Sequence, residues 1–69
     1  MKITDCVTVE AGYRPVTTVW FDGAIPVHVF RFAIIDGERH EAFPVMGKDR
    51  HAVDIIASGD FTGKEISFE

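Results

Sequence analysis

Apolar and polar residues alternate imperfectly over residues 2–10, which predicts a β-strand there, and a second strand is predicted at residues 16–21. In the first strand, Ile3, Val7 and Val9 are expected to share one face, because side chains two positions apart point the same way. The second strand is rich in β-branched and aromatic residues, which favour strands. The connection between them contains a proline, which disfavours helix in the residue before it.

Two Asp-Gly pairs separate apolar, β-rich runs and predict β-hairpins, because both central residues of a type I′ turn need positive φ. At Asp22-Gly23 a two-residue loop would place Trp20 opposite Ile25 and continue into mostly apolar pairs on the same face. The strand that follows is expected over residues 25–35. It is apolar on both faces, so either it is buried on both sides or a bulge near Phe30-Arg31 exchanges its faces.

The second pair, Asp36-Gly37, leads into a fourth predicted strand at residues 39–45. A two-residue loop would place Phe32 opposite Glu41, whereas a four-residue loop would place Phe32 opposite Phe43. The longer loop joins more aromatic surface, and on that ground it is the favoured register.

Residues 50–58 carry apolar side chains at helical spacing and predict a short helix, with Asp49 as its N-cap and Gly59 at its C′ position. Residues 65–69 alternate and predict a last strand at a sheet edge. The expected order is β-β-β-β-α-β, an α+β fold with a bent four- to five-stranded antiparallel sheet and one short helix. A helical element before the last strand resembles SH3-like small barrels, and this resemblance implies a sheet that curls toward a barrel.

Length and composition predict one folded domain, residues 1–69, of which 46% are hydrophobic. A single cysteine excludes an intramolecular disulfide and fits a reducing compartment. The N-terminus lacks an apolar segment of signal-peptide length, and no stretch is long enough to cross a membrane. We therefore expect a cytoplasmic protein that has no membrane partner.

No pattern for catalysis, metal binding or phosphate binding is complete in the chain. Residues 59–65 come nearest to a phosphate-binding loop, but three residues separate the glycines, and Glu65 stands where a serine or threonine is needed. Cys6 and the histidines lack the spacing of a structural zinc site. The residues also offer no nucleophile with a base and an orienting group. We therefore predict that the protein is not an enzyme and holds no metal or cofactor.

An apolar surplus is the feature from which a function can be argued. One short helix cannot cover a five-stranded sheet, yet the second and third strands offer apolar groups on both faces. Either the sheet curls and hides one face, or that face meets another chain. The candidate partner-binding residues are Trp20, Phe21, Phe30, Arg31, Phe32 and Phe43.

These features predict a small acidic interaction module, an inhibitor or regulatory accessory protein of the phage or mobile-element type. It would dock on a larger protein or nucleoprotein complex, and it could form a homodimer. The formal net charge of −4 adds the hypothesis that acidic side chains occupy a nucleic-acid-binding surface, with Asp49, Asp54, Asp60, Glu65 and Glu69 as candidates.

The alternative function is a small β-barrel that stacks single-stranded nucleic acid on its aromatic side chains, beside Arg31 and Arg39. The negative net charge makes direct nucleic-acid binding the weaker hypothesis, because phosphate groups repel an acidic surface.

Overall fold

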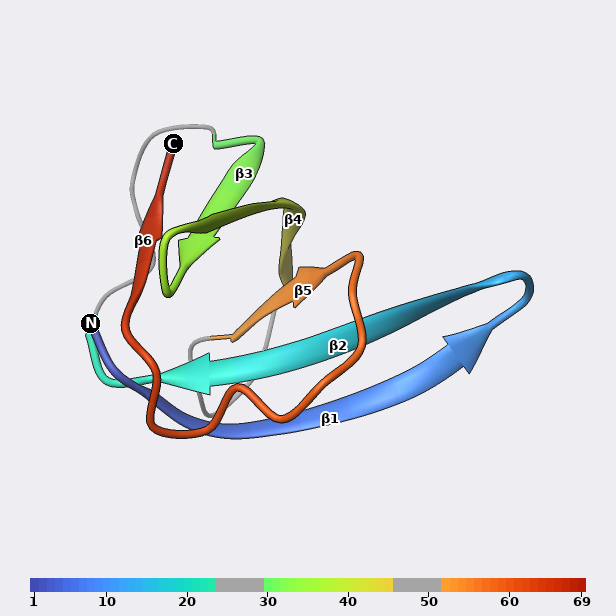
Figure 1. The fold of residues 1–69 in the computed structure, drawn as a ribbon, viewed down its shortest axis with the longest axis horizontal. Helices are drawn as coiled ribbons and strands as arrows, with labels where there is room; N and C mark the ends of the chain where they lie inside the picture. The colour runs from blue at the N-terminus through green and yellow to red at the C-terminus, as the bar shows by residue number, and fades with distance from the viewer. Residues whose placement is uncertain (24–29, 46–51) are drawn as a thin grey trace.

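The computed structural model describes residues 1–23, 30–45 and 52–69, and this part of the chain is all-β (Figure 1). All paired strands are antiparallel, and they form one open six-stranded sheet in the order β1-β2-β5-β4-β3-β6. The strands are β1 (Ile3–Ala11), β2 (Arg14–Phe21), β3 (Phe32–Ile35), β4 (Glu38–Val45), β5 (Ala52–Ile55) and β6 (Ile66–Phe68).

The predicted helix at residues 50–58 is wrong where the structure describes it, and with it the α+β fold class. Ala52–Ile55 forms β5, which pairs with β2 on one edge and with β4 on the other. Val53 and Ile55 are fully buried between these neighbours. A short apolar run has the same periodicity in a buried strand as in a helix, and the β-branched residues here favour the strand.

A tight turn at Asp36-Gly37 sets the register of the β3–β4 hairpin. Asp36 and Gly37 have φ values of 53° and 83°, the signs of a type I′ turn, and Ile35 pairs with Glu38 directly across it. The favoured four-residue loop is therefore wrong, and Phe32 lies opposite Glu41. The predicted partners of β2 across Asp22-Gly23 lie outside the described residues. Within them, β2 pairs with β1 and β5.

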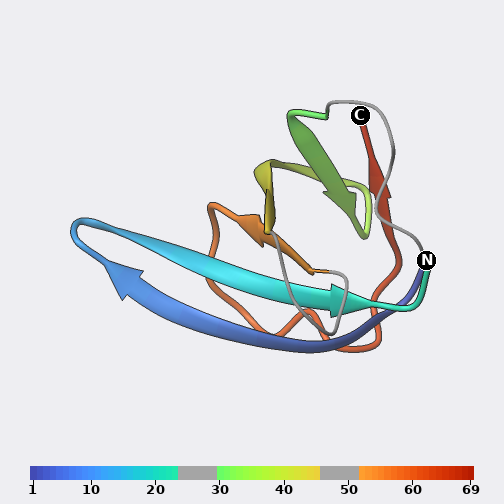
Figure 2. The same ribbon diagram turned by 180° about the vertical axis from the view of Figure 1, so that it is seen from behind.

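The sheet is strongly curved, but it is not the closed barrel that the SH3-like resemblance implied. Its two outer strands meet at one end, where Lys2 and Glu65 form an isolated antiparallel bridge. The N–H of Ile3 also donates to the carbonyl of Lys64 at 2.9 Å. Farther along, the β1–β2 hairpin extends away from the other strands (Figures 1 and 2), so the sheet stays open.

The inner face of the curved sheet holds the hydrophobic core, and burial alternates along β2. Val19 and Phe21 are buried there, while Val16 and Trp20 are half-buried on the outer face. The remaining buried members of this core are Ile3, Phe30, Ala33, Ile35, Ala42, Val53, Ile55 and Ile66.

Irregularities in two strands explain where alternation fails. The β1 register shifts between Ile3 and Asp5, so Ile3 is buried whereas Val7 and Val9 are exposed, and the prediction that these three share a face is wrong. Just before β3, Phe30 and Ala33 are both buried although they are three positions apart. In a regular strand, residues on one face are separated by an even number of positions.

Of the two alternatives for this apolar run, burial on both sides or a bulge near Phe30-Arg31, the described residues favour the bulge. The N–H groups of Arg31 and Phe32 both donate to the carbonyl of Glu69, at 3.0 and 3.2 Å, which is the two-against-one pattern of a β-bulge. The bulge places Phe30 in the core and Phe32 on the outer face.

Candidate functional site

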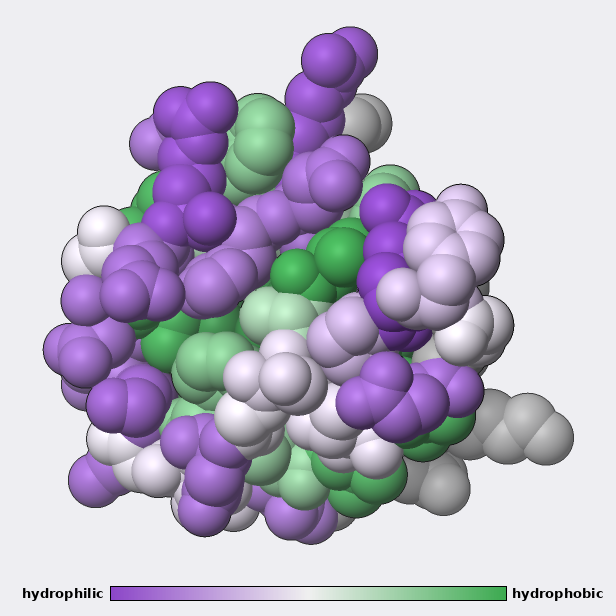
Figure 3. Space-filling view, turned by 45° about the vertical axis from the view of Figure 1, so that its right-hand side comes forward, coloured by the Kyte–Doolittle hydropathy of each residue, from purple (hydrophilic) through white to green (hydrophobic). Residues whose placement is uncertain are grey.

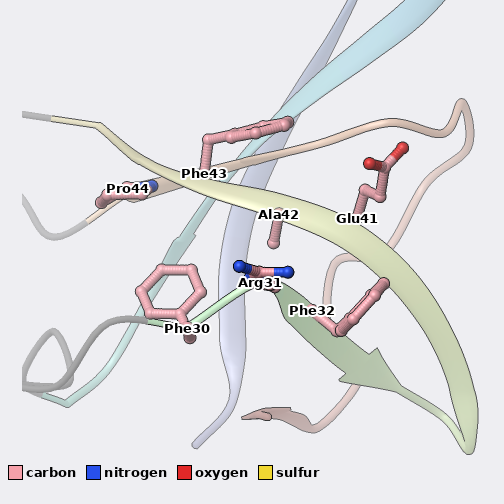
Figure 4. Close-up of a pocket in the computed structure, with 7 residues that line it drawn as sticks. All are labelled: Phe30, Arg31, Phe32, Glu41, Ala42, Phe43 and Pro44. Carbon is pink, nitrogen blue, oxygen red and sulfur yellow. The ribbon is translucent and has the colours of Figure 1, made fainter.

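A groove opens beside the end of the β3–β4 ladder, and we call it the aromatic groove (Figure 4). It has a cavity volume of about 430 Å³ and is lined mainly by apolar groups. Figure 4 shows Arg31 lying between Phe30 and Phe32 on the β3 side, with Phe43 and Pro44 on β4. Its lining residues are Phe30, Arg31, Phe32, Glu41, Ala42, Phe43 and Pro44.

Pro44 explains why the groove opens at this point. The N–H of Ala42 points toward β3 and donates to the carbonyl of Arg31 at 2.9 Å. The next β4 residue whose nitrogen points that way is Pro44, because backbone groups alternate between the two edges of a strand. Proline has no N–H, so the ladder loses its next donor on this side, while β4 continues to pair with β5 as far as Val45.

The groove combines an exposed aromatic ring with two charges that have no ion-pair partner among the described residues. Phe43 keeps 49% of its surface exposed, high for a phenylalanine, and Arg31 and Glu41 are exposed beside it. Among the described residues, no carboxylate lies within ion-pair distance of Arg31, and no cation lies within that distance of Glu41. These two charges are therefore available to a ligand as far as the described part of the chain shows.

Arg39, which contacts Phe32, already has an acidic partner. Its guanidinium lies over the Phe32 ring, 4.1 Å from the centroid, and its Nη1 donates to Oε1 of Glu69 at 3.1 Å. The contact covers part of the Phe32 ring.

The structure brings most of the predicted partner-binding residues together. Phe30, Arg31, Phe32 and Phe43 all line the aromatic groove, with Phe30 as its buried wall. Trp20 lies elsewhere on the outer face, in register with Ala52 and Val45. Phe21 does not belong to any surface. It is buried in the core, with its ring centroid 5.6 Å from that of Phe68.

Sequence reasoning missed the contribution of β4 to this site. Glu41, Ala42 and Pro44 were not among the candidates, although all three line the aromatic groove. Pro44 carried a usable signal, because a proline inside a strand marks a position where pairing stops on one edge.

The outer face bears further exposed apolar groups at the opposite end of the sheet. Val7, Val9 and Tyr13 are 51%, 58% and 95% exposed on the β1–β2 hairpin. Figure 3 shows hydrophobic side chains reaching the surface in the middle of one face, with hydrophilic residues around them.

The acidic candidates lie on separate elements and have local partners. Asp54 accepts a hydrogen bond from the Thr18 hydroxyl at 2.5 Å, and Glu65 pairs with the N-terminal amine at 3.1 Å. Glu69 pairs with Arg39, and Asp60 accepts from the N–H of Thr62. Asp49 lies outside the described residues. In the described part of the chain, these carboxylates therefore do not form one continuous acidic surface.

Asp60 holds the segment after β5 against β1. The N–H of Thr62 donates to its carboxylate at 3.1 Å and is the main reason that the pKa of Asp60 lies below its ordinary value. The Thr62 hydroxyl and the Cys6 thiol, whose Sγ lies 3.5 Å from Oδ1, lower this pKa further.

A lowered pKa in the folded state makes Asp60 stabilising only while it is ionised. We expect Asp60→Asn to lower stability at pH 7, and the difference from the natural chain to shrink as the pH falls below about 4, the ordinary value for aspartate. Urea unfolding of both proteins from pH 7 to pH 2.5 measures it. Glu41→Gln is the control, and a difference for Asp60→Asn that persists unchanged at pH 2.5 contradicts the role given to this carboxylate.

Two other kinds of site are not seen in the described residues. No three histidine, cysteine or acidic side chains among residues 1–23, 30–45 and 52–69 are grouped so that they could hold a metal ion. His28 and His51, two of the three histidines, lie outside these ranges. The same residues include no helix that is long and apolar enough to span a membrane.

Comparison of the chain with protein-family models, with curated proteins and with solved structures finds no match.

Proposed function

We propose that the protein is a non-enzymatic interaction module that docks on a larger protein through the aromatic groove. The observation that carries this proposal is the half-exposed ring of Phe43 beside an open, apolar-lined cavity of about 430 Å³. That volume lies in the range of ligand-binding clefts, and an exposed aromatic ring in such a cleft is typical of an interface anchor.

The chemistry of the groove defines the kind of segment that it takes. Phe30 and Phe32 line it from the β3 side, and Ala42, Phe43 and Pro44 line it from β4. Burial of an apolar side chain between them removes apolar surface of both partners from water. Arg31 lies within the groove and has no carboxylate partner among the described residues.

We therefore propose that the bound segment carries a large apolar side chain next to an acidic residue. A carboxylate on Arg31 forms a charge-assisted hydrogen bond, stronger than a neutral one when the neighbouring rings exclude water. Binding in the groove would inhibit the partner, because the bound surface of the partner could no longer contact its other ligands.

This proposal replaces acidic mimicry with apolar docking as the basis of the interaction. The described acidic candidates pair with their own neighbours, such as Arg39 and the N-terminal amine. Single-stranded nucleic acid is also less favoured, because the net charge is −4 and Arg39, beside Phe32, already bonds to Glu69.

Comparative capture tests the docking surface. The natural chain, Phe43→Asp and Tyr13→Asp are each immobilised and exposed to a lysate of the organism that encodes the chain. We expect a partner retained by the natural chain and by Tyr13→Asp, but reduced at least tenfold on Phe43→Asp, because the added carboxylate lies in the apolar groove. Tyr13 is the matched control, since its ring is 95% exposed at the far hairpin. Equal retention by all three proteins contradicts the proposal.

A further inference from the structure

The outer edge of β1 bonds to Gly63 and Lys64 at Ile3, but beyond Ile3 it is long and has no strand beside it in the described part of the chain. β1 is the first strand in the sheet order and spans nine residues, Ile3–Ala11. The other edge strand, β6, has only three residues, Ile66–Phe68. Natural proteins blunt edge strands with lysine, proline or bulges, because a free edge pairs with other chains. Between Cys6 and Glu10 β1 has no lysine or proline, and its register shift lies earlier, between Ile3 and Asp5.

The hairpin geometry identifies which backbone groups face outward. Ala11 pairs with Arg14 across a two-residue turn, so these two residues exchange the first hydrogen bonds of the β1–β2 ladder. Backbone groups alternate along the strand, and the N–H and C=O groups of Cys6, Thr8 and Glu10 therefore point away from β2. The N–H of Cys6 is capped by Oδ1 of Asp5 at 3.0 Å.

The side chains along β1 are complementary to a second, antiparallel copy of themselves. When Thr8 lies opposite Thr8 of the other copy, Val7 of each strand lies opposite Val9 of the other. Both valines are more than half exposed in the single chain. The same register places outward-facing backbone groups against each other and sets Glu10 opposite Cys6, so no two carboxylates on β1 lie directly opposite each other.

Neighbouring registers fit less well. A shift of two residues in one direction places Asp5 against Val9, and a shift in the other places Val7 against Ala11. Each leaves only one valine pair in contact across the edge, so valine contact selects the Thr8-centred register.

We propose that two copies of this chain associate through β1, antiparallel about Thr8, and continue their sheets into one. This inference does not depend on the aromatic groove, which lies at β3 and β4, on the far side of the sheet. The dimer presents one groove at each end and so binds a partner with paired sites more tightly than one chain does.

Sedimentation velocity of the natural chain across a concentration series tests association, and a pair of charge variants tests the register. Val7→Lys alone and Val9→Glu alone each place a charge against a valine, and we expect each to weaken the dimer about tenfold or more. Mixed together they place lysine against glutamate on one side and keep valine against valine on the other. We expect the mixture to recover the dimer.

Tyr13→Lys is the control, because it adds the same charge outside the paired residues, and its dimer should match that of the natural chain. A natural chain that stays monomeric at every concentration overturns the proposal. Single variants that dimerise as well as the natural chain, or a mixture no better than either variant, also overturn it.

Amide hydrogen exchange tests pairing at this edge on the natural chain alone, so the result does not depend on how well a variant folds. In the natural chain at dimer concentrations, the outward N–H groups of Thr8 and Glu10 should exchange at least tenfold more slowly than after dilution. Equal exchange rates at both concentrations contradict pairing at this edge.

Discussion

Ile55→Ala should lower the free energy of unfolding by about 3 kcal/mol, the middle of the range for truncating a buried isoleucine. Ile55 is fully buried in β5, opposite Thr17 of β2 and Ala42 of β4. The neighbouring strands are held by their own ladders and cannot collapse into the space left by the missing methylene and methyl groups. For a domain of this size, such a loss is a large part of the total stability.

Ile34→Ala is the matched control, because Ile34 is only half-buried on the outer face of β3. We expect it to cost about 1 kcal/mol, in proportion to the smaller apolar area removed from water. Urea unfolding followed by tryptophan fluorescence measures both variants. Equal losses at the two positions would show that β5 is not at the centre of the core.

Thr17→Val should cost about 2 kcal/mol although it preserves the shape of the side chain, because the partly buried carbonyl of Ala57 loses its partner. Thr17 is fully buried, and its hydroxyl donates to the carbonyl of Ala57 at 2.5 Å. The same oxygen lies 2.7 Å from the Thr8 hydroxyl, so one side chain connects β1, β2 and the segment after β5.

Thr17→Ser distinguishes the contribution of the Thr17 hydroxyl to stability from that of its methyl group. It keeps the hydrogen bonds and loses one buried methyl group, for which we expect a cost of about 1 kcal/mol. Thermal and urea unfolding of the two variants measure the difference. A Thr17→Val protein as stable as the natural chain would show that the bond to Ala57 contributes nothing net.

The sequence predicted the strands that have one buried face better than those that do not. The strand predicted at residues 16–21 is observed as Arg14–Phe21, and of the two alternatives for the apolar run near Arg31, the bulge fits the observed change of face. Ala52–Ile55 could not be assigned in the same way. A central strand buried on both sides has no alternation, and its neighbours β2 and β4 are distant in the sequence.

The prediction of the register after Asp36-Gly37 was wrong for a different reason. Aromatic pairing favours Phe32 opposite Phe43, whereas two successive residues with positive φ fix a two-residue loop that places Phe32 opposite Glu41. Phe32 packs under the Arg39 guanidinium instead, and Phe43 is left half-exposed. The two-residue loop therefore leaves Phe43 without an aromatic partner across the β3–β4 ladder, and its ring is exposed in the aromatic groove.

The candidate site was partly visible in the sequence as an excess of aromatic residues. Composition identified Phe30, Phe32 and Phe43, but it could not distinguish the buried Phe21 from them. That distinction depends on which face each strand turns inward, and for Ile3 it depended on a register shift that no residue type announces.

Peptide selection against the groove tests the central claim most directly. A random peptide library is selected on the natural chain, on Phe43→Asp and on Arg31→Glu. We predict that the natural chain enriches peptides with a large apolar residue beside an acidic one, that Phe43→Asp enriches none, and that Arg31→Glu replaces the acidic residue with a basic one. Peptides of the same sequence enriched on all three proteins would contradict docking in the aromatic groove.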